Sequence, residues 1–128
     1  MKIPLFVYGS LMKGEPLHGY LAGLEAREVR TQGRLFRLPA GYPALVPGKG
    51  DGWATGELVS LPSMSKFIVL DMVEGVDRGL YSRQKIQVEW QGQNLNAWAY
   101  VMTLKQVNES NGTRIPSGNW RKVPRSTR

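Results

Sequence analysis

The sequence predicts an α+β fold in which short strands curl toward a small barrel, with two short helices beside it. Three observations lead to this prediction. The chain has 128 residues, 41% of them hydrophobic, which suits one domain with one core. Short segments rich in β-branched and aromatic residues recur along the chain and outnumber helical patterns. Only one segment combines helical spacing with clear end signals.

The first strand is expected at residues 3–8, where an apolar and aromatic run stops at a Gly-Ser pair. A short helix should follow at residues 17–24, because leucines and a tyrosine recur there at i, i+3, i+4 and i+7. Two glycines make that helix marginal. The next strand is expected at 26–38, with Gly33 as a bulge between its halves.

The second half of the chain alternates strands with one convincing helix. That helix should open at Pro62 and Ser63, run to about Glu74 and end at Gly75, the residue type favoured just past a helix C-terminus. A glycine-rich loop at 47–52 reads as a hairpin-type connection. Residues 41–46 should form a turn that leads into a brief apolar stretch, and the remaining strands are expected at 53–61, 83–90 and 95–104.

The missing residue types exclude several kinds of chemistry. The chain has no cysteine, which excludes thiolate nucleophiles, redox pairs and thiolate metal sites. His18 is the only histidine, and we expect it at the surface because it lies on a different helix face from the neighbouring leucines. Any proton transfer therefore falls to carboxylates, tyrosines or lysines, and we expect neither a metal nor a cofactor.

The net charge of +7 first suggests a nucleic-acid or acidic-membrane partner, but its distribution argues otherwise. Residues 104–128 carry six basic residues and one acidic residue, which leaves a charge of only +2 for the rest of the chain. We expect one domain over residues 1–128, with a basic, solvated and mobile tail from about residue 119. No apolar run approaches the roughly 20 residues of a membrane span.

One candidate site is the turn Tyr8-Gly9-Ser10-Leu11 at the end of the first strand. A glycine after a buried strand is commonly just a turn. Such a turn can also direct several backbone N–H groups into one cavity, where they bind a carboxylate or an oxyanion. Tyr81, which opens a later strand, could add a hydroxyl to the same cleft or belong to the core.

The second candidate is Glu74, at the end of the convincing helix. It lies seven residues after Phe67 and so shares the helix face expected to turn inward. Burial, the helix dipole and the nearby Asp71 should all raise the pKa of its carboxyl group toward that of a general base. The alternative is a structural ion pair with Arg78 or Arg83.

Taken in order, these motifs resemble the gamma-glutamylcyclotransferase-like family, and the short chain with its Ser10-Leu11 turn is similar to the compact bacterial and archaeal-type members. The motifs are residues 6–11 (FVYGSL), 41–45 (GYPAL), 56–58 (GEL), 70–75 (LDMVEG), 81–83 (YSR), 97–101 (AWAYV) and 117–120 (SGNW). The resemblance implies a small mixed β-barrel flanked by short helices. It also implies that Tyr8, Gly9, Ser10 and Leu11 cradle the substrate and that Glu74 is the base.

The implied reaction is an intramolecular one. The substrate α-amine attacks the γ-carbonyl of a γ-glutamyl compound, which releases 5-oxoproline and an amine or amino acid. We therefore expect a cytoplasmic enzyme for a small γ-glutamyl molecule, with no membrane partner. Two other functions stay open: a non-catalytic module that binds a small carboxylate metabolite in the same cavity, and, less favoured, a nucleic-acid binder that uses the basic C-terminus.

Overall fold

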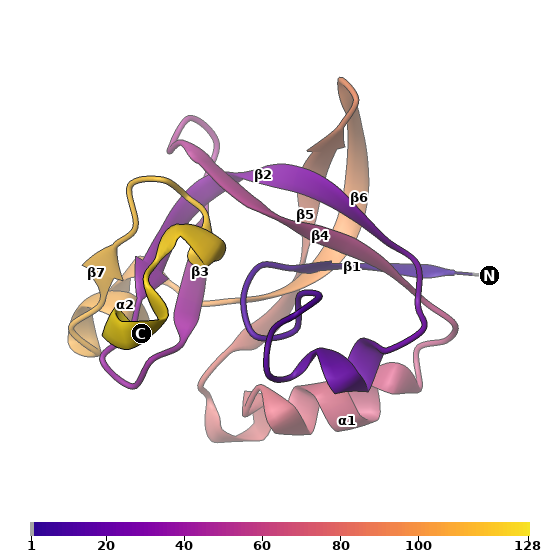
Figure 1. Ribbon diagram of the computed structural model, residues 1–128, viewed down its shortest axis with the longest axis horizontal. Coiled ribbons are helices and arrows are strands. Elements are labelled where there is room, and N and C mark those ends of the chain that lie inside the picture. The colour runs from indigo at the N-terminus through magenta and orange to yellow at the C-terminus, as the bar shows by residue number, and fades with distance from the viewer. Residues whose placement is uncertain (1) are drawn as a thin grey trace.

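The computed structural model describes residues 2–128 and shows a closed five-stranded barrel with a smaller sheet extension and helices at its edge (Figure 1). The strands are β1 (Ile3–Val7), β2 (Ala26–Arg37), β3 (Pro43–Pro47), β4 (Trp53–Leu61), β5 (Ser82–Trp90), β6 (Gln93–Val101) and β7 (Thr113–Arg114). The α-helices are α1 (Lys66–Val73) and α2 (Leu104–Glu109), and the 3-10 turns are η1 (His18–Leu21), η2 (Val76–Arg78), η3 (Trp120–Lys122) and η4 (Arg125–Thr127).

The barrel runs in the order β2, β4, β1, β6 and β5, and it closes because β5 pairs back with β2. β1 is parallel to β6, with Leu5 opposite Trp98, whereas all other strand pairs are antiparallel. The mixed barrel that we expected is thus confirmed. Because β1 lies between β4 and β6, its side chains from Leu5 to Val7 are buried, as the apolar first segment predicts.

β2 changes partners at Gly33. Its first half pairs with β4 up to Gln32, and from Gly33 onward it pairs with β3. A side chain at this position would place a Cβ 2.7 Å from the carbonyl oxygen of Val46. Glycine therefore permits the close approach of β3, at the position where the sequence indicated a bulge.

The helices differ from expectation in three places. The segment 17–24 forms only the turn η1, because the backbone becomes extended at Ala22, with ψ of 137°, and Gly23 follows with a left-handed φ of 80°. The expected helix at 62–74 is the shorter α1, and Gly75 follows it in the left-handed conformation, as predicted. The unpredicted helix α2 begins with a capping box between Thr103 and Gln106. None of the helices in residues 2–128 has the length and hydrophobicity needed to cross a bilayer.

The C-terminal segment is anchored to the molecule through Trp120, Arg121 and Arg128, while residues 121, 122 and 124–127 are exposed to solvent. Trp120 is buried in the main core. The Arg128 guanidinium donates a hydrogen bond of 2.8 Å to Glu15, whose side chain is only 4% exposed, and Arg125 reaches the same carboxylate. Arg121 donates to the carbonyl oxygen of Lys13. Part of the positive charge of this segment is thus paired with a buried carboxylate of the same chain.

Candidate active site

A cavity of about 460 Å³ lies between the loop after β1, the turn η1, the C-terminal end of α1 and the first residues of β3. It brings together all five tyrosines of the chain, Tyr8, Tyr20, Tyr42, Tyr81 and Tyr100. Of the cavity residues in the described chain, only Glu74 and Arg78 carry a formal charge. The cavity therefore combines an apolar and aromatic wall with one carboxylate, Glu74, and one guanidinium group, Arg78.

The loop after β1 leaves three backbone N–H groups without an acceptor in the described chain. The carbonyl oxygen of Gly9 accepts a hydrogen bond from the N–H of Met12, and that of Ser10 accepts one from Leu17. Within residues 2–128, the N–H groups of Gly9, Ser10 and Leu11 donate to no other group. These three N–H groups belong to residues that line the cavity and remain available for an anionic or carbonyl oxygen.

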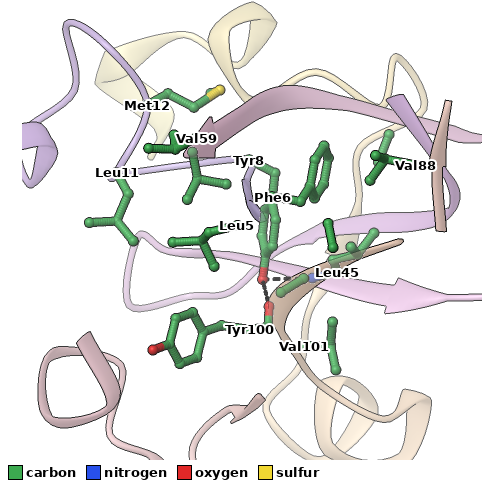
Figure 2. Packing of buried hydrophobic residues seen from close by; sticks show 14 of the residues in the cluster. Leu5, Phe6, Tyr8, Leu11, Met12, Leu45, Val59, Val88, Tyr100 and Val101 are labelled. Carbon is green, nitrogen blue, oxygen red and sulfur yellow. Dashed lines mark hydrogen bonds between the residues drawn. The ribbon is translucent and has the colours of Figure 1, made fainter. Parts of the chain in front are cut away.

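Close packing against β3 sets the course of this loop. A Cβ at Gly9 would overlap the ring of Pro43, so only glycine fits here. Figure 2 shows the hydroxyl of Tyr8 between two backbone groups, donating to the carbonyl oxygen of Tyr100 at 2.5 Å and accepting from the N–H of Leu45 at 3.3 Å. Burial raises the pKa of Tyr8 well above its ordinary value, so its hydroxyl remains a neutral anchor.

Tyr81 also binds β3, because its hydroxyl donates to the carbonyl oxygen of Pro43 at 2.5 Å. The sequence left open whether Tyr81 belongs to the core or to a cleft. It lines the cavity and packs at the edge of the core, so it does both. Burial and the nearby charge of Glu74 raise the pKa of Tyr81.

Glu74 directly follows α1 and is half-buried in the wall of the cavity. In the described part of the chain, its carboxylate forms no ion pair and no hydrogen bond; Arg83, one of the two partners that we considered, pairs with Asp71 instead. Burial raises the pKa of Glu74 to about 7. Of the three causes expected from the sequence, the structure supports burial.

The neighbouring acid, Asp71, is fully engaged. Arg83 donates to its two carboxylate oxygens at 2.9 and 3.2 Å, and the hydroxyl of Tyr100 donates to it at 2.6 Å. The guanidinium of Arg83 also stacks on the rings of Phe67 and Trp98, 4.1 and 5.0 Å from their centroids. This network joins α1 to β5 and β6 just before Glu74.

All six predicted site residues line this cavity: Tyr8, Gly9, Ser10, Leu11, Glu74 and Tyr81. Sequence reasoning missed Tyr20, Tyr42, Arg78, Leu80 and Tyr100, which also line it. His18 lies outside the cavity, half-buried, with its Nδ1 atom 3.0 Å from the carbonyl oxygen of Leu11, so the expectation of a surface position was wrong. No three His, Asp or Glu side chains of residues 2–128 form a group able to hold a metal ion.

Comparisons with known proteins agree with this architecture. Residues 5–122 match the family model for gamma-glutamyl cyclotransferase, AIG2-like. The solved structure of YkqA from Bacillus subtilis is 31% identical with a TM-score of 0.74, and the match covers 95% of this chain and 40% of YkqA. This chain thus spans less than half the length of that protein. No curated protein matches the sequence.

Two further solved structures cover nearly the same length. Uncharacterized protein PH0828 from Pyrococcus horikoshii is 25% identical over 94% of this chain and 92% of that protein, with a TM-score of 0.69. A protein named gamma-glutamyl cyclotransferase is 18% identical over 87% of this chain and 81% of that protein, with a TM-score of 0.66. This last likeness concerns the fold alone.

Proposed function

The chain belongs to the AIG2-like gamma-glutamyl cyclotransferase family, and from this premise we propose that it converts a small γ-glutamyl amide into 5-oxoproline and an amine or amino acid. One observation carries the proposal above the others. A half-buried carboxylate without a partner in the described chain, Glu74, lines the same cavity as the unpartnered N–H groups of Gly9, Ser10 and Leu11. These are the two kinds of group that the reaction requires.

The reaction begins with proton removal. Glu74 accepts one proton from the substrate α-ammonium group, which frees the lone pair of its nitrogen. With a pKa of about 7, the carboxylate is ionised in a large fraction of the molecules at neutral pH, while it remains basic enough to accept the proton.

Ring closure follows. The freed nitrogen attacks the γ-carbonyl carbon, and the carbonyl oxygen becomes an oxyanion that the N–H groups of the loop stabilise. When this intermediate collapses, the bond between that carbon and the leaving nitrogen breaks. The protons held by the ring nitrogen and by Glu74 pass to the leaving nitrogen, so the amine departs and Glu74 is ionised again.

This chemistry needs few groups, because the nucleophile and the carbonyl belong to one molecule. Holding them in contact removes much of the entropic barrier. The packing of Gly9 on Pro43 and the hydrogen bonds of the Tyr8 hydroxyl with Tyr100 and Leu45 support a site rigid enough to impose such a restraint. A base and a set of backbone donors then suffice.

The test is the release of 5-oxoproline from a set of γ-glutamyl amides, measured by mass spectrometry. We expect turnover by the wild type and a loss of at least about 100-fold in Glu74→Gln, the range typical of a general base. Glu28→Gln is the matched control, because Glu28 is an exposed carboxylate on β2 outside the cavity. Equal rates for Glu74→Gln and the wild type would overturn the role of Glu74.

A second measurement distinguishes an enzyme from a module that only binds a carboxylate metabolite: the thermal stability of the protein with the amide, together with the recovery of that amide. Thermal stabilisation by a γ-glutamyl amide, with the amide recovered intact after prolonged incubation, would identify a binding module and contradict catalysis.

A further inference from the structure

The outer part of the cavity differs chemically from its floor. The lining residues of the floor include Tyr8, Leu11 and Tyr100, which are buried, and Ser10, which is partly exposed. The lining residues at the mouth are exposed: Tyr20 by 45%, Tyr42 by 54% and Leu80 by 46%. We refer to these three side chains as the rim. They are three of the eight large hydrophobic side chains that the described chain leaves exposed, and a group of exposed apolar side chains commonly marks a binding surface.

Arg78 is the one cation that lines this cavity in residues 2–128. Its guanidinium lies next to Leu80, because both side chains occupy the space that a side chain at Gly75 would need. A Cβ there would lie 2.7 Å from Cδ1 of Leu80 and 3.0 Å from Nη2 of Arg78. Within the described chain, Arg78 forms no ion pair and donates no side-chain hydrogen bond, although it lies four residues from Glu74.

The course of the reaction determines which part of a substrate reaches the mouth. In the proposed function, on which this inference rests, the γ-glutamyl group occupies the floor, with its amine at Glu74 and its carbonyl at the loop N–H groups. The bond that breaks therefore points away from the floor, and the leaving group extends past the rim and Arg78.

We propose that this mouth selects a leaving group that carries both an aromatic or branched apolar side chain and a free carboxylate. The rim packs against the apolar side chain. The guanidinium of Arg78 binds the carboxylate, the planar anion that it pairs with best. The same cation disfavours a leaving group with a second ammonium charge. The substrate class is thus a γ-glutamyl dipeptide with an aromatic or branched apolar second residue, in preference to a γ-glutamyl polyamine or simple amide.

Four compounds separate these contributions. γ-Glutamylphenylalanine has both features, γ-glutamylphenethylamide keeps the ring but lacks the carboxylate, γ-glutamylglycine keeps only the carboxylate, and α-linked γ-glutamyllysine carries an ammonium group instead of the ring. We expect kcat/KM for γ-glutamylphenylalanine to exceed each of the other values by about tenfold, the size of one charge-assisted contact or one well-packed ring.

Variants assign each preference to its residue. Arg78→Gln should lower kcat/KM about tenfold for γ-glutamylphenylalanine and leave γ-glutamylphenethylamide unchanged. Tyr42→Ala should lower the value for γ-glutamylphenylalanine and leave γ-glutamylglycine unchanged. Lys66→Gln is the control, since Lys66 is an exposed cation on α1 outside the cavity, and it should change neither.

The outcomes are distinguishable. An equal loss on all four compounds in Arg78→Gln would mean that Arg78 binds the carboxylate of the glutamyl group, which would overturn the inference while the proposed function stands. If no compound is turned over, the proposed function fails, and the selectivity is read from Kd values measured by calorimetry. The same order of affinities would support the selective mouth, and equal affinities would overturn it.

Discussion

Replacing the carboxylate of Glu74 by an amide should stabilise the protein above neutral pH. Burial raises the pKa of Glu74 from 4.5 to about 7, so the folded protein holds a proton that the unfolded chain releases between these pH values. The contribution of protonated Glu74 to the free energy of unfolding of the wild type is therefore complete below about pH 4.5. The wild type loses this contribution as the pH rises through about 7. Glutamine has nearly the same shape and does not titrate, so Glu74→Gln avoids this loss.

The magnitude follows from the two pKa values. At about 1.4 kcal/mol per pKa unit, the difference between 4.5 and about 7 corresponds to about 3 kcal/mol. We expect the free energy of unfolding of Glu74→Gln to equal that of the wild type at about pH 4. At about pH 8 it should exceed the wild-type value by up to about 3 kcal/mol. The same substitution is expected to remove activity, as is common where a site holds a group in an unfavourable environment.

The measurement is urea unfolding of both proteins at the two pH values, followed by tryptophan fluorescence. Glu28→Gln removes an exposed carboxylate and should change the free energy of unfolding by less than about 0.5 kcal/mol at either pH. A difference between Glu74→Gln and the wild type that is the same at both pH values would refute the argument, because it would show that burial does not penalise the charge.

Three further predictions concern the site and its support. The kcat/KM of the wild type should rise with pH and level off above about 7, because only ionised Glu74 accepts a proton; a profile that falls over this range would contradict its role. Gly9→Ala should destabilise the protein by about 1 to 3 kcal/mol and reduce activity, because its Cβ overlaps the proline ring at the start of β3. Gly19→Ala has open space and should change neither property, as urea unfolding and activity assays will show. Glu15→Gln should lower stability by about 3 kcal/mol, because its partner cation is mostly buried, whereas Arg125→Gln removes a mostly exposed cation and should cost less than about 1 kcal/mol in thermal unfolding.

Local patterns in the sequence predicted much of the fold. The alternating residues of β5 and the apolar run of β1 both predicted strands. A strand that is buried on one face has an apolar residue at every second position, and a strand that is buried on both faces has apolar residues throughout. α2 was missed because its six residues are too few to show a helical period, although Thr103 and Gln106 carry a capping signal. The packing of the C-terminal segment was missed because a charge count does not show that Glu15 is buried.

Some residues of the site were likewise predictable from the sequence and others were not. Glu74 and the turn at Gly9 could be proposed from the sequence because each lies at the end of a regular element, where residue spacing or a glycine indicates the local structure, and both line the cavity. Tyr42, Arg78 and Tyr100 reach the cavity from separate segments, and no local pattern distinguishes them from residues of the surface or core. That all the tyrosines converge on one cavity is a property of the tertiary structure alone.

The pairing of β1 with β6 determines when the site can form. Leu5 lies opposite Trp98, and the hydroxyl of Tyr8 binds the carbonyl oxygen of a residue 92 positions later. During synthesis, β1 therefore leaves the ribosome long before its partner, and the barrel has no closed form until β6 follows. Contacts of such large sequence separation slow folding. A chain that stops before β6 would therefore hold Glu74 and the loop after β1 but no finished cavity around them.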